Sequence, residues 1–254
     1  MKKVLYIFFS LLFVLAITGV AAAQTMKKEA VQPFNDGLEK AKKGDYKDAL
    51  ADFEKALQFD QDYRIYYQIG FAQMKLNNLD EAIKNYKSAI KADPKFDGAY
   101  NDLGNVYYSQ GKYQDAIDNF EKVLETSKND TVKSTVKFNL SLSYTALATA
   151  AEKDKAYKKA IGYLSKAVSY NDYDFAYLAL ARIYVQTSQY DRAIQAAEKA
   201  LKYKKNIKDG GPNYYIGVAY SQKGDLKKAK EYLTKAKDDP VYKSAAETVL
   251  KAIK

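Results

Sequence analysis

The chain repeats one pattern of apolar and polar positions along its length. In the stretch DLGNVYYSQGKYQDAIDNFEKVL (102–124), apolar side chains recur at helical spacing on either side of Gly111, which predicts two helices joined by a short turn. Gly104 and Ala116 lie twelve residues apart, one in each predicted helix. The same pair, with the Gly in the first predicted helix and the Ala in the second, recurs at three more places: Gly37/Ala49, Gly70/Ala82 and Gly217/Ala229. The pattern therefore predicts a protein built from repeated helix pairs.

The alanine of each pair sets the period of the repeat. Six alanines occupy this place, and successive ones lie 33, 34, 44, 33 and 36 residues apart: Ala49, Ala82, Ala116, Ala160, Ala193 and Ala229. A helix–turn–helix unit with a period near 34 residues is typical of the tetratricopeptide repeat (TPR). The chain resembles that family over residues 27–240. The second copy follows the family pattern of small, aromatic and proline positions with Gly70, Ala82, Tyr86, Ala89 and Pro94, but it has Gln73 where the pattern has an aromatic residue.

The resemblance implies an all-α fold, a TPR-type α-solenoid in which helix pairs stack into a right-handed superhelix. It divides the chain into six repeats, at about residues 30–62, 63–96, 97–130, 134–173, 174–207 and 210–240. Residues 241–254 carry apolar side chains at helical spacing, so we expect them to form a C-terminal capping helix.

The packing within a repeat follows from the small residues. We expect the Gly and Ala of each pair to face each other where the two helices come closest, because a larger side chain there would push the helices apart. Gly44, Gly111 and Gly224 fall at the predicted turns, where a left-handed backbone conformation favours glycine.

The fourth repeat departs from the period. We place its small residue at Ser141, nineteen residues before Ala160, so that its first helix is about two turns longer than the others. Two interpretations are open: a longer helix without a further role, which we favour, or a ridge that contacts a partner.

The first 23 residues differ from the rest of the chain. Lys2 and Lys3 precede an uncharged apolar run at residues 4–20, and Ala21 and Ala23 supply small residues before Gln24. This pattern predicts a signal peptide over residues 1–23, and hence an exported protein of the periplasm or cell envelope. The alternative is an uncleaved anchor, since the apolar run is at the short end of a membrane span, about 17–25 residues. After cleavage we expect no stable membrane span.

The amino-acid composition limits the kinds of catalysis and metal binding that the chain can support. The chain has no Cys, no His and no Trp, and it has 24 Tyr. Thiolate and imidazole catalysis are excluded, a zinc site is not expected, and we predict a protein that is not an enzyme and needs no cofactor.

The formal net charge of the chain is +10, or +8 without Lys2 and Lys3. Its lysines are scattered among acidic residues, so we expect no nucleic-acid binding. For the lysine-rich stretch 202–211 we favour a solvated loop over contact with anionic lipid or glycan.

The function is therefore expected to depend on a surface. The resemblance implies a concave groove lined by the first helix of each pair. Aromatic residues and Arg are common interface anchors, and Asn can hydrogen-bond a peptide backbone or sugar hydroxyls. We predict binding of a protein or peptide, of unknown identity, along this groove, with a cell-wall glycan as the alternative partner. The predicted groove residues are Tyr67, Phe71, Met74, Asn101, Asn105, Tyr108, Phe138, Asn139, Leu142, Arg182, Tyr214 and Ser221.

Overall fold

The structure, a computed structural model, describes residues 26–253, and these residues form thirteen α-helices and no strand. The prediction of an all-α fold is confirmed. The predicted signal peptide, residues 1–23, lies outside the described residues. The described residues form two compact units, one that ends at Pro94 and one that begins at Lys95.

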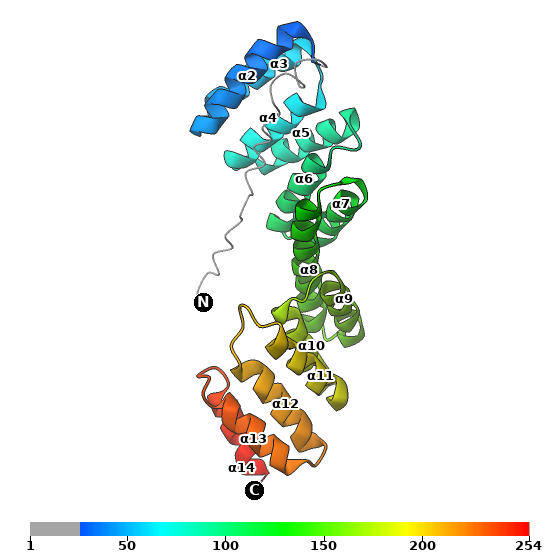
Figure 1. The fold of residues 1–254 in the computed structure, drawn as a ribbon, viewed down its shortest axis with the longest axis vertical. Helices are drawn as coiled ribbons and strands as arrows, with labels where there is room; N and C mark the ends of the chain where they lie inside the picture. Colours follow the sequence, from blue (N-terminus) through cyan, green and yellow to red (C-terminus); the bar gives the residue numbers. More distant parts are fainter. Residues whose placement is uncertain (1–25, 254) are drawn as a thin grey trace. The chain divides into compact units, whose positions relative to one another are not determined.

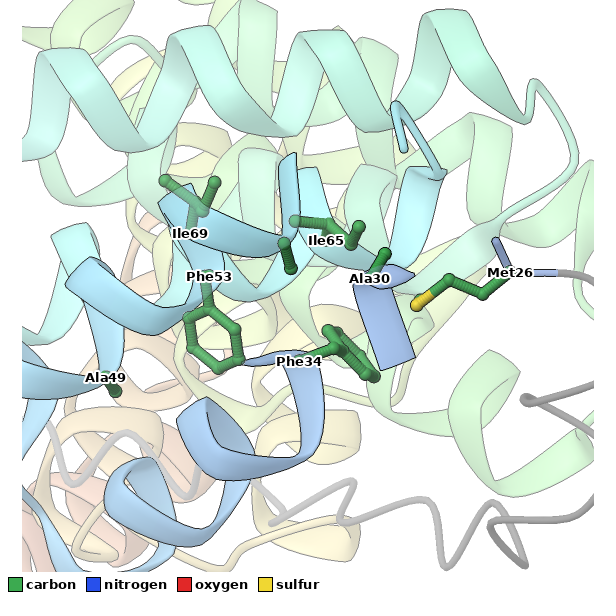
Figure 2. Close-up of a cluster of buried hydrophobic side chains, with 8 residues drawn as sticks. Met26, Ala30, Phe34, Ala49, Phe53, Ile65 and Ile69 are labelled. Atoms are coloured by element: carbon green, nitrogen blue, oxygen red, sulfur yellow. The ribbon is translucent and has the colours of Figure 1, made fainter. Parts of the chain in front are cut away.

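The first unit contains two helix pairs. Helix α2 packs against α3, α4 packs against α5, and α3 joins the two pairs by packing against α4. The bounds are α2 (Lys28–Lys43), α3 (Tyr46–Phe59), α4 (Tyr63–Lys75) and α5 (Leu79–Ala92). Their core is drawn in Figure 2, where the rings of Phe34 and Phe53 lie 5.9 Å apart beside Ile65 and Ile69 of α4. Because α4 supplies apolar side chains to the core of the preceding pair, the pairs stabilise each other.

The second unit contains four helix pairs and a terminal helix (Figure 1). The first helices of the pairs are α6 (Asp97–Ser109), α8 (Asp130–Lys153), α10 (Asp174–Gln186) and α12 (Gly210–Gln222). The second helices are α7 (Tyr113–Thr126), α9 (Tyr157–Tyr170), α11 (Tyr190–Lys202) and α13 (Leu226–Ala236), and α14 (Lys243–Ala252) follows. Successive pairs pack through α7 and α8, α9 and α10, and α11 and α12. We call the first helix of a pair the A helix and the second the B helix.

The turn inside each pair uses a left-handed residue. Gly44, Gly111 and Gly224 have φ of 90°, 74° and 83°, as predicted. The three remaining pairs place other residues at this point, with φ near 60°: Asn77, Lys155 and Ser188. The turn geometry is thus the same in all six pairs, with or without a glycine.

The packing of the small A-helix residue differs from our expectation. The nearest atoms that a Cβ on Gly104 would meet belong to the ring of Phe120, at 2.6 Å, and not to Ala116. The other three glycines show the same relationship, each with the residue sixteen positions later: Gly37 with Phe53, Gly70 with Tyr86, and Gly217 with Leu233. The glycine is needed because a large B-helix side chain fills the space over the A-helix backbone.

The register that we predicted for the fourth repeat is wrong. In the other pairs the B helix begins nine residues after the small A-helix residue, as Tyr113 follows Gly104. Helix α9 begins at Tyr157, so the equivalent residue is Ala148, which is buried, and not Ser141. Seven residues are almost two full turns, so Ser141 and Ala148 lie on the same face of α8 and the sequence pattern could not separate them. The extra turns therefore lie at the start of α8.

The last helix covers the end of the second unit. Helix α14 packs on α13, with Ala246 buried beside Leu233 and Ala236. Lys237 and Glu247 approach to 3.9 Å between the two helices. Earlier repeats have apolar residues at the positions of Lys230 and Lys237. These lysines thus belong to the last repeat, whose B helix no further pair covers.

Candidate functional site

Three of the predicted binding residues lie on α4 in the first unit. Tyr67, Phe71 and Met74 are half-buried, and their spacing places them on one face of the helix. The ring of Tyr67 lies 5.8 Å from that of Tyr86, whose hydroxyl donates to Sδ of Met74 at 3.8 Å. Phe71 meets the ring of Tyr46 edge-on at 6.1 Å. Each side chain therefore packs on one side and keeps an exposed part that a partner could contact.

The equivalent residues of α6 form a polar surface in the second unit. Asn101, Asn105 and Tyr108 are half-buried. The Asn105 Oδ1 atom accepts a hydrogen bond from Nδ2 of Asn139 on α8 at 3.3 Å, so two predicted residues from adjacent repeats are brought together. Tyr108 packs against Tyr113, with ring centroids 5.4 Å apart. An Asn pair of this kind still has one amide group and one carbonyl group to offer to a ligand.

Three predicted groove residues on α8 do not occupy the repeat positions that we assigned to them. Phe138, Asn139 and Leu142 lie two turns earlier on α8 than the places we assigned to them, which are occupied by Thr145, Ala146 and Thr149. Phe138 is 39% exposed, and its ring meets that of Tyr173 at 5.7 Å. Asn139 and Leu142 are half-buried.

Arg182 on α10 is held by a residue that the sequence analysis did not select. Its Nε and Nη2 atoms donate to the two carboxylate oxygens of Glu152 at 2.8 and 2.7 Å. Burial lowers the pKa of the guanidinium, but the hydrogen bonds and charge of Glu152 outweigh that effect and raise it. Glu152 lies four residues after Ala148, as Tyr108 lies four after Gly104, so the correct register would have identified it. Bidentate pairing fixes the guanidinium plane and leaves Nη1 for a ligand.

Tyrosines adjoin this ion pair. Tyr214 lies 5.3 Å from Tyr215 and 5.5 Å from Tyr242, measured between ring centroids. Burial, and then the neighbouring Tyr242, raise the pKa of Tyr215 well above its usual range. Ser221, about two turns after Tyr214 on α12, is half-buried. Tyr215 and Tyr242 were also missed, because neither occupies one of the repeat positions from which we selected the groove residues.

We define the A-helix face of the second unit by Asn101, Asn105, Tyr108, Glu152, Arg182, Tyr214 and Ser221, all of which are half-buried. The face combines aromatic rings, amides and one anchored cation, which are side chains common in protein interfaces. Within residues 26–253, no group of three or more Asp and Glu side chains is arranged to hold a metal ion. In the same range, no helix has the length and apolar character that crossing a membrane requires.

Three family models match five ranges of the chain, two of which overlap. A model described as TPR repeat matches residues 73–111, and two described as tetratricopeptide repeat match residues 98–130 and residues 37–63, 176–207 and 213–238. Among curated proteins, the small glutamine-rich tetratricopeptide repeat-containing protein 2 of Mycosarcoma maydis is 33% identical over 89 residues. That match covers 35% of this chain, and the chain spans only 25% of the relative's length.

Solved structures show the same fold. The structure of YrrB, described as a TPR protein with an unusual peptide-binding site, is 25% identical, covers 77% of this chain and 97% of its own, and gives a TM-score of 0.50. The C-terminal part of a TPR repeat-containing protein from Cytophaga hutchinsonii is 19% identical, covers 92% of each chain and gives a TM-score of 0.60. The helix pairs, the spacing of their small residues and these matches all indicate the same repeat fold. The chain is therefore an all-α solenoid of tetratricopeptide repeats.

Proposed function

We propose that this protein is a non-enzymatic binding module that holds a protein or peptide partner along its A-helix faces. The observation that carries the proposal is the exposure of the predicted residues: none of the twelve is fully buried, although other residues of the same helices are. On α6, for example, Leu103 and Val106 are in the core while Asn105 and Tyr108 reach solvent. Aromatic and amide side chains kept at the surface are typical of a recognition surface.

The similarity to YrrB supports this choice of ligand, because that protein is described as having a peptide-binding site. The amino-acid composition favours a binding role over a catalytic one. With no His and no Cys in the chain, acid–base and nucleophilic chemistry near pH 7 would depend on carboxylates, lysines and tyrosines alone.

Capture of the partner tests the proposal. The purified protein would be immobilised and exposed to extract of its source cells at low and at high salt, beside an Asn105→Ala/Tyr108→Ala variant. We expect one enriched protein that survives high salt and that the variant captures far less. A Gln195→Ala/Glu198→Ala variant, altered at exposed positions of α11, is the matched control and should capture the partner normally. Equal capture by all three would contradict the assignment of the face, and enrichment of glycan alone would favour carbohydrate binding.

We further propose that the module acts in the periplasm or cell envelope. This rests on the composition of residues 1–23. Mass spectrometry of the protein recovered from its own cells tests it. A mature chain that starts at Gln24 is expected, and a chain that retains Lys2 and Lys3 in the cytosolic fraction would contradict export.

A further inference from the structure

The two irregular segments of the repeat array meet at one hollow in the second unit. The other A helices of that unit begin seven residues before their small residue, whereas α8 begins at Asp130, eighteen before Ala148. The loop 203–209 between α11 and α12 has seven residues, whereas the loop 171–173 has three. Both segments line a hollow of about 300 Å³. Its lining residues are Ser134, Thr135, Phe138, Asn171, Asp172, Tyr173, Asp174, Lys205 and Asn206. Insertions in repeat proteins often lie on the binding face. We call this site the insertion hollow.

The long loop is held in place by a buried carboxylate. Oδ2 of Asp174 accepts hydrogen bonds from the backbone N–H groups of Lys205, Asn206 and Ile207, at 2.7, 2.6 and 3.2 Å. Asp174 is only 2% exposed, so solvent does not compete for these bonds. The loop therefore presents Lys205 and Asn206 in a fixed place, and a preorganised surface loses less entropy when a ligand binds.

Exposed aromatic rings border the hollow. The ring of Tyr173 lies 5.7 Å from that of Phe138 and 5.6 Å from that of Phe175. Phe138 and Phe175 are 39% and 43% exposed, among the highest values for large apolar side chains of the described residues. Rings that remain exposed beside a fixed loop are the kind of anchor that dominates protein interfaces.

Lysines are concentrated in the two segments that border the hollow, although Asp172 and Asp174 belong to its lining. Residues 95–254 contain 27 Lys and Arg against 19 Asp and Glu, whereas residues 26–94 contain 12 of each. The start of α8 contributes Lys133 and Lys137, and the long loop contributes Lys205 and Lys208. Among the described residues none of these four lysines forms an ion pair. Three acidic residues nearby have partners of their own: Asp172 accepts from the Tyr177 hydroxyl, Asp174 accepts from the loop backbone, and Asp209 pairs with Lys204. Asp172 and Asp174 keep their negative charge, so an acidic ligand must place its carboxylates beside the lysines and away from these two side chains.

We infer that the insertion hollow docks an acidic protein segment that carries an aromatic side chain. The aromatic residue packs on Phe138 and Tyr173, and the flanking carboxylates face Lys205 and the lysines at the start of α8. Charge complementarity of this kind selects the partner and speeds association, while the ring supplies most of the affinity. The inference rests on the proposed protein-binding function but uses residues other than those that define the A-helix face.

A factorial panel of synthetic peptides tests it. Peptides of equal length would carry a central Phe or Ser flanked by either Glu or Gln, and binding to the protein produced from its whole sequence would be measured by fluorescence anisotropy. The Phe/Glu peptide should bind, and the Ser/Glu and Phe/Gln peptides should each bind about tenfold more weakly. A Phe138→Ala/Lys205→Glu variant should also lose about tenfold in affinity for the Phe/Glu peptide.

The matched control is a Leu226→Ala/Lys227→Glu variant at the start of α13, where Leu226 is 43% exposed and both residues lie far along the chain from the hollow. It should bind the Phe/Glu peptide as the unaltered protein does, and circular dichroism should show both variants folded. Any of three results would overturn the inference. They are no binding of the Phe/Glu peptide below about 1 mM, binding of that peptide to the Phe138→Ala/Lys205→Glu variant as tight as to the unaltered protein, and binding of the Ser/Glu peptide as tight as that of the Phe/Glu peptide. Binding to phosphatidylglycerol vesicles without binding to the panel would point to a membrane surface instead. Failure of the panel leaves the A-helix face unaffected, because partner capture with the Asn105→Ala/Tyr108→Ala variant tests that face alone.

Discussion

Gly104 of α6 lies directly beneath the ring of Phe120 of α7, so that a Cβ on the glycine would come within 2.6 Å of the ring. Phe120 is buried, so its ring can move away only by disturbing the core side chains around it. We expect Gly104→Ala to lower the free energy of unfolding by about 1–3 kcal/mol, because the helix pair must open to admit the methyl group. Equilibrium unfolding in urea, followed by circular dichroism, measures the change.

Gly162 provides the control for this substitution. It lies exposed within α9, and a Cβ there would meet nothing within 4 Å. Gly162→Ala should therefore raise stability by roughly 0.5–1 kcal/mol, through helix propensity. Equal effects of the two substitutions would mean that Gly104 is not needed for close packing.

The second prediction concerns a turn that lacks its glycine. Lys155 has φ of 57° between α8 and α9, where three other pairs place glycine. A left-handed conformation is unfavourable for a residue with a side chain, by about 1–2 kcal/mol. Lys155→Gly should therefore stabilise the protein by roughly 0.5–1 kcal/mol after the entropy of glycine is counted, measured by thermal unfolding.

The exposed middle of α11 supplies the contrast for this turn. Glu198 lies there in ordinary helical conformation, and Glu198→Gly should be destabilising by about 1 kcal/mol. If Lys155→Gly lowers stability as Glu198→Gly does, the turn does not need a left-handed residue.

The third prediction concerns pH. Burial raises the pKa of Asp174, but the N–H groups of Asn206, Lys205, Ile207 and Phe175 outweigh it and hold the pKa below its ordinary value of 3.8. A carboxyl whose pKa is lower in the folded state stabilises the protein fully above its unfolded pKa, and that stabilisation is lost as the pH falls through the folded value. Asp174→Asn should therefore lower stability at pH 7, by about 1–3 kcal/mol, and lessen its decline below about pH 4.

Urea unfolding between pH 7 and pH 2 measures both effects of Asp174→Asn. Asp172→Asn is a suitable control, since Asp172 is exposed and accepts only the Tyr177 hydroxyl. If Asp174→Asn and the unaltered protein show the same acid profile, Asp174 does not anchor the loop through its charge.

The fourth prediction tests the register of the fourth repeat. Arg182 and Glu152 meet only if Ala148, and not Ser141, occupies the repeat position of the small residue. A double-mutant cycle with Arg182→Gln and Glu152→Gln should give a coupling energy of about 0.5–1 kcal/mol, kept small because the Arg182 side chain is 42% exposed. A second cycle with Asp154→Asn, at an exposed residue near the end of α8, should give none. Coupling to Asp154 in place of Glu152 would refute the register.

The repeats could be predicted from sequence because they depend on local features. Each pair has a small residue and an alanine twelve positions apart, and each turn has a residue that adopts a left-handed conformation. The fourth repeat could not be placed in the same way. Ser141 and Ala148 lie on one face of α8, so the apolar pattern fits either, and only the distance from Ala148 to the start of α9 distinguishes them.

The candidate surfaces were harder to predict than the helices. Asn105 was selected from its repeat position and Asn139 through the wrong register of the fourth repeat, and the structure joins the two by a hydrogen bond. Glu152 was missed through the register error, and Tyr242 because it precedes α14, outside any repeat position. The insertion hollow combines residues more than sixty positions apart, Phe138 and Lys205 among them, and no local sequence pattern indicates that they meet.

The central claim is that the A-helix face binds a protein partner, and photocrosslinking in the source cells tests it most directly. A photoreactive benzoylphenylalanine would replace Tyr108 or Ser221 on the A-helix face, or Lys122 on the exposed surface of the B helix α7. Covalent adducts to one protein from positions 108 and 221, with none from position 122, are the predicted result. Adducts from position 122 alone, or no protein adduct from either position on the face, would contradict the claim.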